Sequence, residues 1–130
     1  MTKKEHIEYW LDSAQSDWES VSLLFDGGKF VQSLFFTHLT LEKISKAMYI
    51  KFSQEIYPPK THDIVKLLSK TDIIFDDDMV VFLKAFNVYN LEGRYPDYLG
   101  NIYKTTSKEN TSKLIHRAGE IRLCLLKMMQ

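Results

Sequence analysis

Apolar residues recur at steps of three and four along the first part of the chain, which is the spacing of one face of an α-helix. The stripe runs from Ile7 to Leu24 through Trp10, Leu11, Ala14, Trp18 and Val21. The "DGG" at residues 26–28 predicts its end, because glycine readily adopts the left-handed conformation that closes many helices. We therefore expect a first long helix up to about residue 26.

A second stripe begins near Lys29 and comprises Phe30, Leu34, Thr37, Leu41, Ile44 and Met48. Further apolar residues around the same cylinder, Phe35, Leu39 and Phe52, predict a helix that is buried on more than one side. The two-glycine connection favours antiparallel packing of the first two helices. The prolines of "YPPK" at residues 57–60 should stop the second helix, since they lack amide donors.

The remainder of the chain also has helical spacing. "THDIVKLLSK", which starts at residue 61, predicts a short helix with Thr61 as its N-cap. A fourth helix is expected in "DDDMVVFLKAFNVYN" and a last one around Leu114–Met128, joined by a polar, turn-rich connection at residues 93–110. No segment has a strand pattern, so the predicted fold is all-α: an up-down four-helix bundle with an additional short helix, forming a single domain over residues 1–130.

Composition narrows the functional classes only a little. Seventeen basic and seventeen acidic side chains cancel, so no overall field indicates a nucleic-acid-binding protein. There is no apolar signal core or uncharged run long enough to span a membrane, which favours a cytoplasmic protein without a membrane partner. Glycine-rich phosphate loops, zinc-ligand spacings and nucleophile elbows are absent, so we expect no metal and no cofactor.

Polar residues interrupt the apolar surface of the second helix. His38, Glu42 and Lys46 follow at steps of four and share one ridge. The base rate favours a solvated face with ordinary ion pairs. The alternative is burial beside a partner helix, in which case Glu42 would need Lys46 or an arginine to offset the cost of removing its charge from water.

His62 and Asp63 open the short third helix, where we expect a capping role. A histidine oriented by a carboxylate can act as a general base, but adjacent helical positions do not face each other. The spacing therefore disfavours a catalytic dyad formed by these two residues.

Arg94 and Tyr95 lie in "LEGRYPDYLG", just after the fourth helix. A guanidinium is suited to phosphate or carboxylate, and a tyrosine ring can stack on a base, so these residues could hold a nucleotide. Alternatively, Arg94 pairs with Glu42 or Asp17 and fixes the loop to the bundle. From the residues alone we favour this structural role.

The order of three segments, "AQSDWESVSLLFDGGKFVQSLFFTHLTLEKISKAMY", "PPKTHDIVKLL" and "NVYNLEGRYPDY", resembles the HEPN domain family of small helical-bundle proteins. The matching positions are Ala14, Asp17, Leu23 and Leu24; Glu42, Lys46 and Ala47; Thr61, His62 and Asp63; and Arg94, Tyr95 and Pro96. The resemblance implies a homodimer with a nucleotide- or RNA-related role, often paired with a minimal nucleotidyltransferase in a toxin–antitoxin system.

Many relatives are ribonucleases that use an arginine followed, after four to six residues, by a histidine. Here the first histidine after Arg94 is His116, so this motif is missing. We therefore predict a binding module rather than an enzyme, with Arg94, Tyr95, His62, Glu42, Lys46 and Asp17 as binding residues and no assigned catalytic residue. The alternative is a ribonuclease with a non-standard site, such as Arg94 with His62 or His38.

Overall fold

The computed structural model describes residues 1–90 and 96–130, and these form α-helices with no strand. The helices are α1 (Lys3–Asp26), α2 (Phe30–Lys51), α3 (Ile64–Ser69), α4 (Asp77–Phe86), α5 (Pro96–Thr105) and α6 (Lys108–Met128), with a 3₁₀ helix η1 (Asn87–Tyr89) after α4. The prediction of an all-α helical bundle is confirmed.

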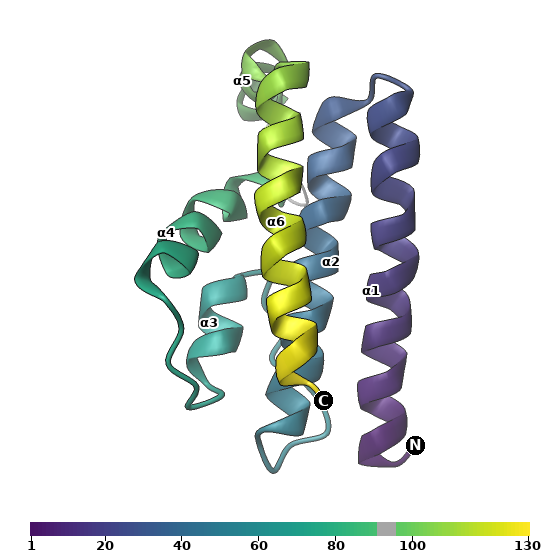
Figure 1. Cartoon of the computed structure of the whole chain (residues 1–130), viewed down its shortest axis with the longest axis vertical. Coiled ribbons are helices and arrows are strands. Elements are labelled where there is room, and N and C mark those ends of the chain that lie inside the picture. Colours follow the sequence, from purple (N-terminus) through teal and green to yellow (C-terminus); the bar gives the residue numbers. More distant parts are fainter. Residues whose placement is uncertain (91–95) are drawn as a thin grey trace.

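The three long helices α1, α2 and α6 lie side by side along the long axis, and α3 and α4 cover another side of α2 (Figure 1). The chain runs up α1, down α2, up through α3 and α4, and down α6, so both termini lie at the same end (Figure 1). No helix in the described ranges is long and apolar enough to cross a membrane.

The ends of α1 follow from local chemistry. Thr2 and Glu5 form a reciprocal capping box at its start. At its end, Gly28 has a φ of 77°, in the left-handed region that glycine occupies without steric cost, and this lets the chain reverse into α2.

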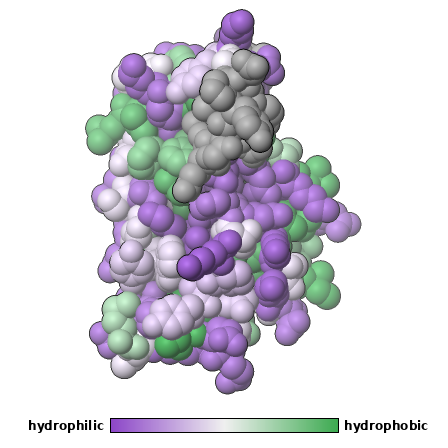
Figure 2. Space-filling model, turned by 180° about the vertical axis from the view of Figure 1, so that it is seen from behind, coloured by the Kyte–Doolittle hydropathy of each residue, from purple (hydrophilic) through white to green (hydrophobic). Residues whose placement is uncertain are grey.

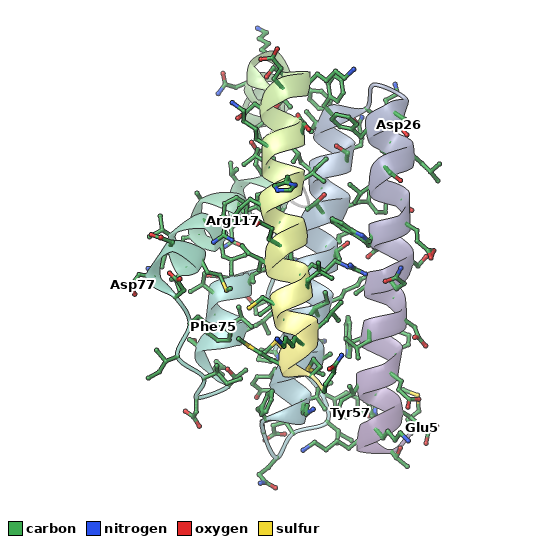
Figure 3. All side chains as sticks on the ribbon, viewed as in Figure 1. Glu5, Asp26, Tyr57, Phe75, Asp77 and Arg117 are labelled. Atoms are coloured by element: carbon green, nitrogen blue, oxygen red, sulfur yellow. The ribbon has the colours of Figure 1, made fainter. Side chains whose placement is uncertain are left out.

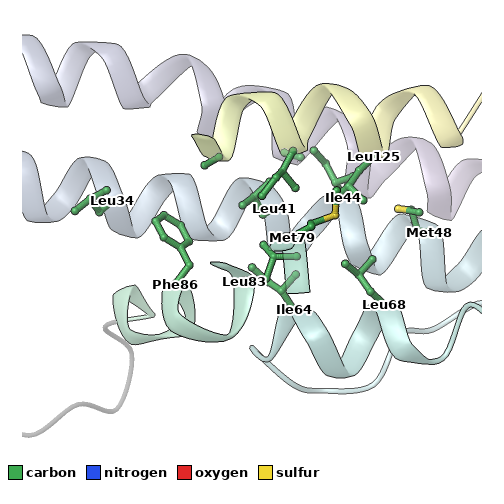
Figure 4. Close-up of a cluster of buried hydrophobic side chains, with 13 residues drawn as sticks. Leu34, Leu41, Ile44, Met48, Ile64, Leu68, Met79, Leu83, Phe86 and Leu125 are labelled. Atoms are coloured by element: carbon green, nitrogen blue, oxygen red, sulfur yellow. The ribbon is translucent and has the colours of Figure 1, made fainter. Parts of the chain in front are cut away.

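The core lies around α2, which is buried along most of its length. The cluster of buried apolar side chains draws on α1, α2, α3, α4 and α6 (Figure 4). Its fully buried members include Leu34, Leu41, Ile44, Ile64, Leu83, Phe86 and Leu125. The expectation that the second helix is buried on several sides is confirmed.

Three predicted boundaries were wrong. α2 ends at Lys51, well before the prolines, because Ser53 starts a turn in which its hydroxyl accepts from the amide of Glu55. α3 is capped by Asp63 rather than Thr61: the Asp63 carboxylate accepts from the amide of Lys66.

The third wrong boundary concerns residues 93–110, for which the sequence predicts a polar, turn-rich connection. α5 occupies residues 96–105, and α6 already begins at Lys108 with Ser107 as its N-cap. Pro96 is the first residue of α5, a position where its missing amide donor costs nothing. Ile102 is buried, and Gln32 of α2 donates to the Tyr103 hydroxyl at 3.0 Å, which together hold α5 against the start of α2.

We expect Leu41→Ala to lower the free energy of unfolding by about 2–5 kcal/mol, because Leu41 is fully buried and the cavity cannot close completely. Urea denaturation measures this change. The matched control is Leu23→Ala on α1, whose side chain is 74% exposed, and it should change stability by less than about 0.5 kcal/mol. Equal losses for the two variants would contradict the placement of the core.

Candidate functional site

Glu42 is a buried carboxylate at the centre of a polar cluster on α2. Glu42 is only 2% exposed, and the two oxygens of its carboxylate have different partners. Oε2 accepts from Lys46 Nζ at 2.8 Å, while Oε1 lies 3.0 Å from His62 Nδ1. The expectation of a solvated ridge was therefore wrong, and the alternative of burial with Lys46 as partner is confirmed.

The cluster is buried because two later segments fold over the ridge. His62 lies just before α3 and contacts Glu42 of α2, and Asn87 begins η1 after α4 and contacts His38 of α2. Glu42 therefore has one partner on α2, Lys46, and one in the segment before α3, His62. These two contacts offset the cost of burying its charge. Lys46 is fixed further by Trp10 of α1, whose ring centroid lies 5.0 Å from Nζ.

Asn87 connects the parts of this cluster. Its Oδ1 lies 3.0 Å from His38 Nε2 and 3.4 Å from the amide nitrogen of Ile64, and its Nδ2 donates to Asp63 Oδ1 at 2.9 Å. The Ile64 amide and the Asp63 carboxylate fix the orientation of the Asn87 amide. Since Oδ1 can only accept, His38 carries a proton on Nε2.

His38 is completely buried, and its second ring nitrogen, Nδ1, lies 3.8 Å from Glu42 Oε1 without a hydrogen bond. Burial lowers the pKa of His38 below its usual value, while the hydrogen bond to Asn87 and the charge of Glu42 act in the opposite direction. His38 is thus held neutral in the folded protein, with Nδ1 as the nitrogen without a proton.

His62 is the member of the cluster that reaches solvent, with a side chain that is 43% exposed. With Nδ1 donating to Glu42, its other nitrogen, Nε2, is the basic atom of the neutral ring. A histidine oriented by a buried carboxylate can bind an anion when protonated and exchange a proton with a ligand. The partner that positions His62 is Glu42 rather than its neighbour Asp63, which caps α3.

The six predicted site residues separate into three groups. His62, Glu42 and Lys46 come together. Asp17 lies in a different contact, an ion pair of 2.7 Å with Lys43 that joins α1 to α2. Arg94 and Tyr95 lie outside the described residues, so their predicted roles, including a pairing of Arg94 with Glu42 or Asp17, stay predictions.

Asn87 belongs to the same cluster but was not predicted from the sequence as a site residue. The available signal was weak: an asparagine at the end of an apolar helix is common as a cap or turn residue. Its partners are 49 residues away at His38 and 24 residues away at Asp63, and no periodic pattern connects such positions. Within the described residues, no group of three or more histidine, cysteine, aspartate or glutamate side chains could hold a metal ion.

We expect the neutral state of His38 to make the fold sensitive to acid. The unfolded chain, with a histidine pKa near 6.5, binds a proton more readily than the folded protein does. The stabilisation is therefore complete above that value and is lost as the pH falls toward the lower pKa of the folded state. Urea denaturation at about pH 7.5 and about pH 5 measures this loss.

The test variant is His38→Gln, which has no titrating ring and should lose less stability between the two pH values than the parent does. His116→Gln on the exposed side of α6 is the matched control and should behave like the parent. An acid-induced loss of the same size in His38→Gln and in the parent would contradict the role of His38.

Comparisons with known proteins agree with this architecture. The family model described as "HEPN domain" matches residues 7–128. The chain is similar in structure to the crystal structure of TT1696 from Thermus thermophilus, with a TM-score of 0.76 and 18% sequence identity, over 93% of this chain and 96% of that one. At this identity the likeness concerns the fold.

No functionally curated protein matches the chain. The family match nevertheless extends over nearly the whole sequence, including α1, the ridge of α2 and the segment before α3. The chain belongs to the HEPN domain family.

Proposed function

We propose that this protein is a nucleotide- or RNA-associated binding module whose site is centred on His62. The observation that carries the proposal is the pair formed by His62 Nδ1 and the buried Glu42 Oε1, 3.0 Å apart. The His62 imidazole reaches solvent, and a buried carboxylate that is itself paired with a lysine fixes its orientation. Burying that carboxylate costs free energy, and such an arrangement is typical of a site that binds a ligand.

The chemistry of the predicted residues fits a phosphate-bearing ligand. Arg94 follows η1 by a few residues in the sequence, and η1 itself is bound to Asp63, next to His62. An arginine and a protonated histidine provide donors for phosphate oxygens, and Tyr95 provides a ring for stacking on a base. Glu42 acts as a positioning residue that fixes the orientation of His62, and Lys46 pairs with Glu42.

The surface around the far side of α2 is compatible with such a ligand. Seen from behind the view of Figure 1, the described surface is largely hydrophilic, with hydrophobic residues mostly toward its margins (Figure 2). A polar face of this kind is wetter than the cores of obligate protein interfaces and suits a charged ligand.

The family also supports a proposal about partners. We propose that the protein forms a homodimer and pairs with a minimal nucleotidyltransferase in a toxin–antitoxin system. The identity of the adjacent open reading frame bears on the second partner, because a nucleotidyltransferase gene there would support the pairing.

The binding proposal is tested by calorimetric titration of the full chain with a nucleoside triphosphate and with a single-stranded RNA oligonucleotide. We expect binding by the parent, and an affinity at least about tenfold weaker for His62→Ala and Arg94→Ala, because the first loses an oriented ring nitrogen and the second loses a charged donor to phosphate. His116→Ala on α6 is the matched histidine control.

Thermal unfolding of the same variants separates the two roles considered for Arg94. A lower melting temperature with unchanged ligand affinity would indicate a structural pin, whereas lost affinity at an unchanged melting temperature indicates a binding residue. Failure of the parent to bind either ligand would overturn the binding proposal.

RNA cleavage is a second candidate function, favoured by one observation: Glu42 orients His62 as a carboxylate orients a catalytic base. In transesterification the 2′-oxygen loses its proton and bonds to phosphorus, the bond from phosphorus to the 5′-oxygen breaks, and that oxygen takes up a proton. His62 Nε2 is suited to accept the first proton, and Arg94 to stabilise charge on the phosphate.

For this second candidate, purified protein is incubated with end-labelled RNA in the presence of a chelator. We expect His62→Ala and Arg94→Ala each to slow cleavage by at least about 100-fold, and Glu42→Gln to slow it less. Cleavage that survives the first two substitutions would disprove this assignment of residues. An inactive parent that still binds RNA would leave the binding module as the function.

A further inference from the structure

A hollow lies at the end of the molecule that holds both chain termini, between the start of α1 and the ends of α2 and α6 (Figure 1). Its volume is about 570 Å³, which is in the range of sites that take small organic ligands. Three apolar side chains, three lysines and one glutamate line it. The hollow therefore combines an apolar floor with a charged rim.

The floor is formed by Ile7, Leu11 and Met129. Ile7 and Leu11 lie on successive turns of α1, and Met129 directly follows α6. All three are partly buried, and Leu11 and Met129 also pack against the main apolar core. The floor is thus an apolar recess next to the core, and covering it with a hydrocarbon chain would remove apolar surface from water.

The rim is formed by lysines. Lys3 and Lys4 are exposed at the start of α1, and Lys51, the last residue of α2, is partly buried. Lys3 Nζ donates to the carbonyl oxygen of Ser53 at 2.6 Å, and Lys51 Nζ donates to the carbonyl oxygen of Met129. These contacts hold two ammonium groups beside the hollow, and each uses one of the three donors that an ammonium group has.

Carboxylates do not neutralise these lysines. Among the described residues, none of the three forms an ion pair. Glu8 is the one acidic side chain in the lining, and it is exposed. Glu5, at the same end of α1 (Figure 3), is held in the capping box with Thr2, and Glu55 does not line the hollow. The lining therefore keeps an excess of positive charge.

We propose that this hollow binds a detached anionic amphiphile with a single hydrocarbon chain, such as a fatty-acid carboxylate. The chain lies on the apolar floor, and the carboxylate accepts from the remaining donors of Lys51 and from Lys4. Hydrogen bonds between two charged groups are stronger than those between neutral groups. The apolar floor alone would suit a neutral hydrocarbon, and the lysines alone would suit a simple anion, but together they favour an amphiphile.

This site is separate from the cluster around His62. Lys51 follows Glu42 by nine residues on α2, which corresponds to about 14 Å along the helix. None of the residues that line the hollow belongs to that cluster. The inference therefore goes beyond the proposed function and does not depend on it.

The first test is calorimetric titration of the full chain with dodecanoate below its critical micelle concentration. We expect dodecanoate to bind at least about tenfold more tightly than dodecyltrimethylammonium, which has the same chain and a positive headgroup, because the lysines repel that headgroup. Acetate, which has the headgroup without the chain, should also bind at least about tenfold more weakly. Failure of dodecanoate to bind, or equal binding of the two amphiphiles, would overturn the proposal.

Two further measurements locate the ligand and identify its source. In methyl NMR spectra the signals of Ile7 and Met129 should shift on addition of dodecanoate, and the melting temperature should rise, because the ligand binds the folded state. A lower melting temperature would show that the amphiphile denatures the protein and would overturn the site. Binding to phosphatidylglycerol vesicles without binding to dodecanoate would overturn it in favour of a membrane surface.

Variants assign the contact with the headgroup. The combination of Lys4→Gln with Lys51→Gln should weaken dodecanoate binding at least about tenfold, whereas Glu8→Gln should bind at least as tightly as the parent. Lys84→Gln on the exposed side of α4 is the matched control and should bind like the parent. Equal losses in the double variant and in Lys84→Gln would contradict the assignment to the hollow.

The comparison of probes on the parent protein does not depend on these variants, so it decides the proposal even if the loss of Lys51 lowers stability. All of the variants should bind the RNA oligonucleotide like the parent. Failure of dodecanoate binding with intact RNA binding would overturn this inference alone, and the reverse result would overturn the proposed function alone.

Discussion

The buried charge of Glu42 is the constraint on which the rest of this structure depends. A carboxylate in the middle of a core helix is tolerated only if several donors reach it, because removing it from water costs several kcal/mol. Lys46 comes from the same helix, but His62 must be brought from the segment before α3. The positions of α3, α4 and η1 against α2 are therefore fixed by polar contacts as well as by apolar packing.

This arrangement gives the central helix two different sides. Toward α1 and α6 it packs largely through apolar side chains, with Lys43 and Asp17 as an ion pair that joins α1 to α2. Toward η1 and the segment before α3 it presents His38 and Glu42, and Lys46 lies beside them and also contacts Trp10 of α1. A single helix thus serves as both the centre of the core and the floor of the candidate site, so changes in the site also affect stability.

Much of the fold follows from periodicity, since the stripes of α1, α2, α4 and α6 were readable from spacing alone. The helix α5 could not be predicted in this way, because it contains Gly100 and many polar residues and has no clear apolar stripe. Its contacts with the rest of the fold come from Ile102 and Tyr103. The site was harder to predict. The ridge on α2 could be predicted from its spacing, but its burial could not. Glu42 is covered by His62, 20 residues away, and His38 by Asn87, 49 residues away, and only folding brings these residues together.

The small amide of Asn87 has a further consequence for motion. It holds the cap of α3, the proton of His38 and the first turn of η1 in one set of hydrogen bonds. A local opening that releases η1 therefore also removes the hydrogen bonds of Asn87 to the α3 cap residue Asp63, to the Ile64 amide and to His38. We therefore expect these segments to open as one cooperative unit in amide hydrogen exchange, although 24 residues separate Asp63 from Asn87.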